Sequence, residues 1–145
     1  FMGVAKLQAC APSPHSQVGA CIVSRTIRFC PWDITDFLWG VQTMNFPGQE
    51  GDELDTKYFY VTHSELNAIL NYRGGSLEGA KLYVSLFPCN ECAKAIIQAG
   101  IKTIVYECDK YADSPAVKAS KRILDAAGVR YYQYNHTGRK LEVEV

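Results

Sequence analysis

Residues 81–108, which read KLYVSLFPCNECAKAIIQAGIKTIVYEC, carry the clearest secondary-structure pattern in the chain. Two short runs, 81–86 and 103–108, are rich in β-branched, aromatic and leucine residues and predict strands. Between them, Pro88 precedes a helical pattern of apolar residues that Gly100 closes. The stretch therefore predicts a strand, a helix and a second strand in succession.

The same alternation of strands and helices continues on both sides of this unit. Further strands are predicted at 18–23 and 129–134, with 141–145 as another candidate, and further helices at 1–10, 64–71 and 114–127. Strands that alternate with helices predict an α/β fold with a parallel or mixed sheet and helices on both faces. The length of 145 residues fits one domain, residues 1–145.

The composition excludes several classes of protein. The chain is 48% hydrophobic and 21% charged, which excludes a disordered, collagen-like or coiled-coil protein, and its apolar runs are too short for a membrane span. Fifteen basic residues balance fifteen acidic ones, so we expect no long nucleic acid partner. The neutral charge does not exclude a small anionic ligand, because such a ligand needs only a local pocket. Lys118, Lys121 and Arg122 on one predicted helix are interpreted as a solvated face.

The N-terminus and the cysteines bear on the cellular compartment. Since the chain begins at Phe1 rather than at Met, we expect N-terminal residues of the protein to be missing. Residues 1–4 lack a basic residue and no long apolar stretch follows, so no signal peptide is predicted and a cytoplasmic location is expected. The six cysteines are then metal ligands or buried thiols rather than disulfides, and Cys10, Cys21 and Cys108 are predicted to be buried.

Two short motifs have the spacing of a metal site. His63 and the pair Cys89 and Cys92 each stand at the start of a predicted helix, and the two cysteines, three residues apart, share one helix face. Alone, the cysteine pair would equally fit a redox pair or half of a structural site, and the histidine a helix cap. One imidazole and two thiolates together predict a zinc site with an open fourth position, as in catalytic zinc sites.

Glu65 is the candidate for proton transfer at this site. It lies two residues after His63, a spacing that places it beside the metal rather than on it. The combination of H-x-E with P-C-x-x-C is the signature of zinc deaminases that act on nucleobases. In that chemistry the glutamate takes a proton from the attacking water and gives it to the ring nitrogen, and in a separate step it protonates the leaving amine.

Several segments around these motifs resemble one particular family, the deoxycytidylate (dCMP) deaminases of the cytidine deaminase-like superfamily. The resemblance covers residues 1–23 and 51–134. The matching segments are SQVGACIV at 16–23, LDTKY at 54–58 with YV at 60–61, LFPCNECAK at 86–94, IQAGIK at 97–102 and DKY at 109–111. Relatives that deaminate free cytidine, tRNA adenosine or guanine share the zinc pattern but not these flanks.

The resemblance implies a three-layer α/β/α sandwich with a central mixed sheet of about five strands. It implies one catalytic Zn²⁺ bound by His63, Cys89 and Cys92, a proton shuttle at Glu65 and nucleotide contact at Tyr111. The implied reaction converts dCMP to dUMP with release of ammonia and supplies dUMP for thymidylate synthesis. It also implies a homo-oligomer, often a hexamer, and regulation by dCTP and dTTP, with Mg²⁺ accompanying the effector.

The chain departs from the family at three places. Ser64 stands where the family usually has Ala, and Phe59 where it usually has Pro. The large departure is residues 24–50, where the family carries a motif like GYNGFPxGCxDDELPW that helps to hold substrate and effector. Here the chain reads SRTIRFCPWDITDFLWGVQTMNFPGQE, in which no steady pattern predicts a helix or a strand.

A change of reading frame accounts for this segment. Tryptophan and methionine have single codons, so a frame that starts at the third base of each codon can be partly read from the protein. In that frame, the codons that begin with the last base of Trp32 and of Trp39 must encode Gly. The codon that begins with the last base of Met44 must encode Glu. These are the spacings of the family motif, and the positions between are compatible with it. We hypothesise that about residues 25–48 are translated out of frame; the alternative is a divergent loop.

Two other functions fit parts of the pattern. A nucleic-acid cytosine or adenosine deaminase would share the zinc motifs, but the neutral charge and the flanking segments disfavour it. A catalytically impaired deaminase-like subunit that binds nucleotide would also keep the zinc site. The atypical residues 24–50 are the reason to consider it.

Overall fold

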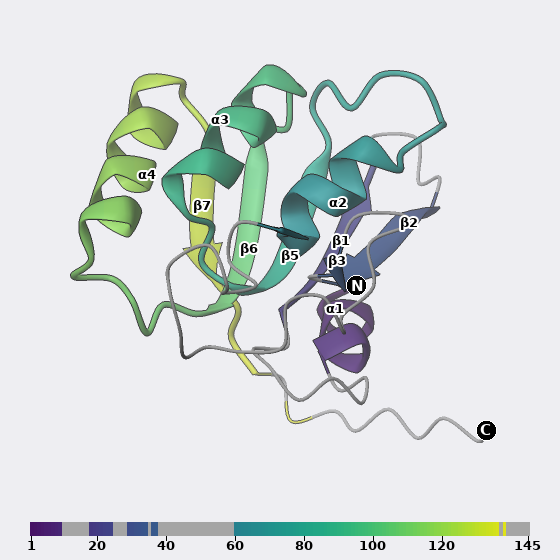
Figure 1. Cartoon of the computed structure of the whole chain (residues 1–145), viewed down its shortest axis with the longest axis horizontal. Helices are drawn as coiled ribbons and strands as arrows, with labels where there is room; N and C mark the ends of the chain where they lie inside the picture. The colour runs from purple at the N-terminus through teal and green to yellow at the C-terminus, as the bar shows by residue number, and fades with distance from the viewer. Residues whose placement is uncertain (10–17, 25–28, 35, 38–59, 137, 139–145) are drawn as a thin grey trace.

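The computed structural model describes residues 1–9, 18–24, 29–34, 36–37, 60–136 and 138 of the chain (Figure 1). The helices in these ranges are α1 (Met2–Ala9), α2 (Ser64–Leu70), α3 (Asn90–Gln98) and α4 (Pro115–Ala126). The strands are β1 (Gly19–Val23), β2 (Phe29–Ile34), β3 (Asp36–Phe37), β4 (Val61–Thr62), β5 (Lys81–Leu86), β6 (Thr103–Cys108) and β7 (Arg130–Gln133).

Five of these strands form one mixed sheet in the order β2-β1-β5-β6-β7. Strands β5, β6 and β7 run parallel, because α3 and α4 carry the chain back between them. Strand β1 is antiparallel to both β5 and β2. The predicted strand–helix–strand unit at 81–108 and the mixed sheet of about five strands are therefore confirmed.

Helices cover both faces of this sheet and make three layers (Figure 1). One face packs against α2, α3 and α4 in a core that includes Ala68, Ile96 and Leu124, with Ile22 and Ile104 from the strands. A smaller core joins α1 to the other face; its buried members are Met2, Ala5, Cys21 and Val105. Neighbouring residues on one strand, such as Ile104 and Val105, thus serve opposite cores, as the two-residue period of a strand requires.

Three strands, β2, β3 and β4, lie where the sequence pattern predicted none. Strand β2 falls inside residues 24–50 and pairs with β1 at the edge of the sheet, with a register shift around Cys30 and Pro31. Proline has no N–H to donate, and edge strands and bulges are where a sheet accepts it. Strand β3 pairs with β4, and β4 ends directly before His63. Backbone pairing with neighbouring strands organises these residues despite the absence of a periodic side-chain pattern.

The remaining predicted elements agree with the structure to within a few residues. The chief exception among the side chains is Cys108, which is exposed rather than buried because it ends β6 beyond the cover of the helices, whereas Cys21 is buried as predicted. The candidate strand at 141–145 and Cys10 lie outside the described residues.

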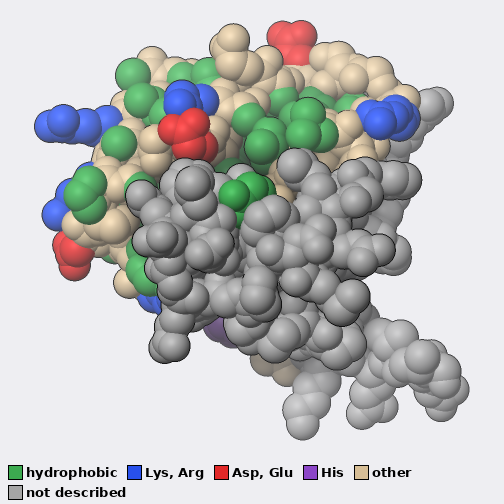
Figure 2. All heavy atoms as spheres, in the orientation of Figure 1, with side chains coloured by type: hydrophobic (Ala, Val, Ile, Leu, Met, Phe, Trp, Pro, Cys, Tyr) green, Lys and Arg blue, Asp and Glu red, His purple; other side chains and the backbone are tan. Residues whose placement is uncertain are grey.

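On the face shown in Figure 2, the Lys and Arg side chains of the described residues are scattered among acidic and apolar ones rather than gathered together. Of the helices in the described ranges, none has the length and apolar character needed to cross a membrane.

Candidate metal centre

The three predicted ligands stand at the first turns of two neighbouring helices. His63 follows β4 and is the N-cap residue of α2, and Cys89 follows β5 and is the N-cap residue of α3. Both have extended backbone angles, and neither side chain caps its own helix. Cys92 lies in the first turn of α3 and is buried. The positive ends of the two helix dipoles therefore meet where the thiolates lie, which favours their negative charge.

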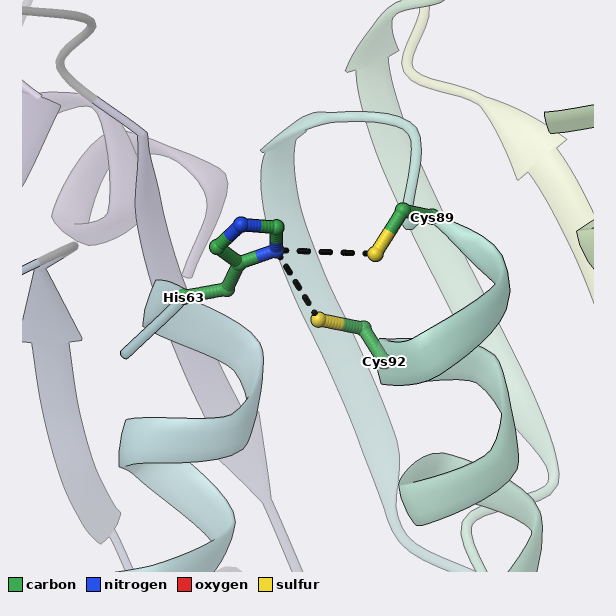
Figure 3. A group of neighbouring side chains, drawn as sticks. All are labelled: His63, Cys89 and Cys92. Carbon is green, nitrogen blue, oxygen red and sulfur yellow. Dashed lines mark hydrogen bonds between the residues drawn. The ribbon is translucent and has the colours of Figure 1, made fainter. Parts of the chain in front are cut away.

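The three side chains converge on one point (Figure 3). His63 Nδ1 lies 3.5 Å from Cys89 Sγ and 3.4 Å from Cys92 Sγ. All ligand atoms of the group lie within 4.8 Å of one another. Tetrahedral zinc with its usual bond lengths to nitrogen and sulfur separates such atoms by about 3.6 Å. The donor set and its spacing therefore fit zinc, through the Nδ1 atom of the histidine.

The two cysteines shift one another's pKa values in opposite directions. The hydrogen bond from Cys92, assisted by the nearby His63, lowers the pKa of Cys89 to about 3. The same hydrogen bond to Cys89, together with burial, raises the pKa of Cys92. The hydrogen bond with Cys89 also raises the pKa of His63. Because cysteine binds a metal as its thiolate, metal binding at this pair depends on pH.

Glu65 lies in the first turn of α2 with its carboxyl turned into the protein. Its side chain is almost fully buried, with 4% exposed, and Ser64 Oγ donates a hydrogen bond of 3.0 Å to its Oε2. Burial raises the pKa of the Glu65 carboxyl, while its own backbone N–H, the charge of His63 and the Ser64 hydroxyl oppose the shift. A carboxyl whose pKa is raised toward neutrality is suited to accepting and returning a proton.

The structure places Tyr111 in the turn between β6 and α4. Its side chain is 51% exposed, and Lys110 Nζ lies 4.7 Å from its ring centroid. The turn follows β6 at the same end of the sheet where Cys89 follows β5, since Leu86 and Cys108 are neighbours in the parallel pair. Tyr111 is therefore on the metal side of the molecule, although no contact joins it to the three ligands in the described residues.

Two features of this region escaped the sequence analysis. One is the hydrogen bond from Ser64 to Glu65, which no residue pattern signals. The other is an ion pair between Lys121 and Asp109, where the sequence predicted a solvated lysine. A signal for it was present in the helical spacing, because Lys121 lies four residues after Val117 and three before Leu124, two apolar residues of α4 that are buried.

Comparison with known proteins bears on the site directly. A family model for the cytidine and deoxycytidylate deaminase zinc-binding region matches residues 1–108. The His/Cys/Cys group of Figure 3 lies within that match and is the zinc site typical of the family.

Individual relatives agree with the family match. A probable deoxycytidylate deaminase of Drosophila melanogaster is 47% identical over 142 residues, covering 92% of this chain and 70% of the relative. The deoxycytidylate deaminase of Homo sapiens is 44% identical over 137 residues, covering 92% and 77%. The crystal structure of dCMP deaminase from the cyanophage S-TIM5 in complex with dCMP and dUMP has a TM-score of 0.71 at 21% identity, covering 92% of this chain and 93% of that one. The solved structure thus shares the fold.

Proposed function

This chain belongs to the cytidine and deoxycytidylate deaminase zinc-binding family, and we propose that it catalyses the zinc-dependent hydrolytic deamination of dCMP. One water and one dCMP give one dUMP and one ammonia. The observation that carries the proposal is the group of His63, Cys89 and Cys92, with the buried carboxyl of Glu65 two residues from the histidine. The choice of dCMP as the substrate is based on the deoxycytidylate deaminases that are 44–47% identical to this chain.

The residues divide the chemistry between them. A zinc ion in this site supplies Lewis-acid activation of water at neutral pH. Glu65 accepts a proton from the attacking water and passes it to the ring nitrogen beside the amine-bearing carbon. It then takes the second proton from the oxygen that has added to the carbon and gives it to the amine, so that the carbon–nitrogen bond breaks and ammonia leaves. Three protein ligands leave the fourth tetrahedral position for this chemistry.

Further properties follow from the same family assignment as parts of this proposal. Tyr111 contacts the nucleotide, for which its exposed ring on the metal side of the sheet is suited. The chain assembles into a homo-oligomer, often a hexamer in such enzymes, and responds to dCTP and dTTP with Mg²⁺. It acts in the cytoplasm as a single domain. Gel filtration with light scattering, and assays with each effector, test the assembly and the regulation.

Ammonia release from dCMP is the direct test of the reaction. We expect the purified, zinc-loaded chain to release one ammonia per dUMP formed, with much less from cytidine. A single-stranded DNA oligonucleotide should release none, since the chain has a formal net charge of zero. Oligonucleotide deamination at a rate equal to that of dCMP would instead identify a nucleic-acid deaminase. Stoichiometric zinc without ammonia from any cytosine nucleotide would identify an impaired nucleotide-binding subunit.

The frame hypothesis for residues 25–48 has its own test. Its support is the fixed codons of Trp32, Trp39 and Met44, and resequencing the gene decides it, because codons that fail to spell the family motif in the shifted frame would exclude it. We expect a chain carrying the shifted reading to exceed the chain as written by about tenfold or more in kcat/KM, since misplaced binding groups are costly. Equal kcat/KM values with equal zinc content would favour a divergent but functional loop.

A further inference from the structure

The Asp109–Ser114 turn, which connects β6 to α4 and carries Tyr111, is closed by its own hydrogen bonds. The amide of Ala112 donates to the carbonyl oxygen of Asp109 (3.1 Å), and the amide of Ser114 donates to that of Tyr111 (2.9 Å). Ser114 Oγ also donates to the Tyr111 carbonyl oxygen at 2.8 Å. The same hydroxyl accepts from the amide of Val117 and caps α4. The C-terminal end of the turn is therefore fixed to the helix.

The other end of the turn is held by an ion pair. Asp109 Oδ2 lies 2.7 Å from Lys121 Nζ, and the two side chains are only 17% and 30% exposed. The second oxygen of the carboxylate, Oδ1, is buried and has no hydrogen-bond partner among the described residues. Lys121 is therefore the principal partner of a largely buried charge. Removing one partner of such an ion pair destabilises the fold strongly, because the charge of the other partner stays buried and uncompensated.

The same lysine contacts the segment that leads to the metal. Its Nζ lies 5.1 Å from the ring centroid of Phe87, a buried residue two positions before Cys89. The Phe87 ring packs edge-on against Tyr106 and Tyr131 at 4.9 and 5.4 Å. The Phe87 amide donates a hydrogen bond of 2.8 Å to the carbonyl oxygen of Cys108, the residue directly before Asp109. One lysine thus touches both the approach to the zinc ligand and the first residue of the turn.

We propose that the Asp109–Lys121 ion pair positions the Tyr111 ring relative to the metal centre and thereby sets the affinity for the nucleotide. The inference rests on the proposed function. The Tyr111 side chain is half exposed, so little packing holds it in place, and its position depends on the backbone of the turn. That backbone is anchored at Ser114 by the helix cap and at Asp109 by Lys121. The pair is a positioning device and takes no part in the chemical step.

The Lys121→Met variant tests this role while keeping the length and apolar contact of the side chain. We expect KM for dCMP, and the dissociation constant of the product dUMP measured by calorimetry, to rise by about tenfold or more. The value of kcat and the zinc content should stay within about twofold, since an interaction lost equally from ground and transition states raises KM alone. Lys121→Arg, which keeps the charge, should restore most of the affinity.

A matched control lies one turn away on the same helix. Lys118 forms an ion pair of 3.8 Å with Asp113, which lies in the Asp109–Ser114 turn, but both side chains are exposed. Lys118→Met should therefore leave KM and dUMP binding unchanged, because exposed ion pairs contribute little. If Lys121→Met fails to fold, the double variant Asp109→Asn, Lys121→Met removes the uncompensated charge and should show the same loss of affinity.

The outcomes separate this inference from the proposed function. An active wild-type chain whose Lys121→Met or double variant binds dUMP with unchanged affinity would overturn the positioning role alone. A fall in kcat or zinc content with unchanged KM would also overturn it, because the pair would then serve the metal loop rather than the turn. A wild-type chain that binds no nucleotide would overturn both proposals, whereas one that binds dUMP tightly without turnover, and loses affinity on Lys121→Met, would overturn only the reaction.

Discussion

Replacing Glu65 by glutamine should lower kcat for dCMP by about 10²- to 10⁴-fold, the range that general acid–base catalysis supplies. The amide has nearly the same volume as the carboxyl, and its oxygen can still accept the hydrogen bond from Ser64 Oγ. It cannot take up the proton of water or return it to the amine. Burial raises the pKa of the Glu65 carboxyl, which suits it to holding a proton between the two transfers. Ammonia release under saturating dCMP measures the loss.

The control for this variant is a glutamate at the start of the neighbouring helix. Glu91 lies between the two cysteine ligands in sequence, but its side chain is 68% exposed and pairs with Lys94. Glu91→Gln should therefore keep kcat within about twofold, because exposed ion pairs contribute little. Zinc content should match wild type in both variants. Retention of kcat by Glu65→Gln with bound zinc would assign the proton transfer to another group.

Replacing Cys92 by alanine should remove zinc and with it the deaminase activity. Cys92 is buried and lies 3.4 Å from His63 Nδ1 at the centre of the site. Removing a residue that only hydrogen-bonds to a metal ligand already lowers metal affinity by about 10- to 100-fold. Removing a ligand itself should lower it more. We expect zinc, measured by atomic absorption after gel filtration, to fall from one equivalent to near zero. A strong chelator should inactivate the wild-type chain, and added zinc should restore it.

A buried cysteine elsewhere in the fold separates ligation from packing. Cys21 is buried in the small core beneath α1, on the sheet face opposite the helices that carry the ligands. Cys21→Ala should lose some thermal stability through the cavity it leaves but keep zinc and kcat. Circular dichroism should show folded protein for both cysteine variants. Full zinc occupancy in Cys92→Ala would show that the metal binds without this residue.

The secondary structure around the site was predictable because its patterns are local. The strands β5 and β6 and the helix between them follow from short apolar runs, Pro88 and Gly100. The ligands followed from residue type and spacing, since Cys89 and Cys92 share a helix face wherever that helix lies. Strands β2 and β3 were not predictable, because no periodicity marks them and only backbone pairing with β1 and β4 organises them.

The sequence by itself determined the alternation of elements, the ligand types, the carboxyl at Glu65 and the family resemblance, because each of these depends on residue identity at short spacing. Only the tertiary structure decided which side chains meet. It set His63 Nδ1 at 3.4 and 3.5 Å from the two thiols, turned Ser64 toward Glu65 and joined Lys121 to Asp109. These are contacts between elements or depend on burial, and the free energy of burying charge and matching partners arises only when the layers pack.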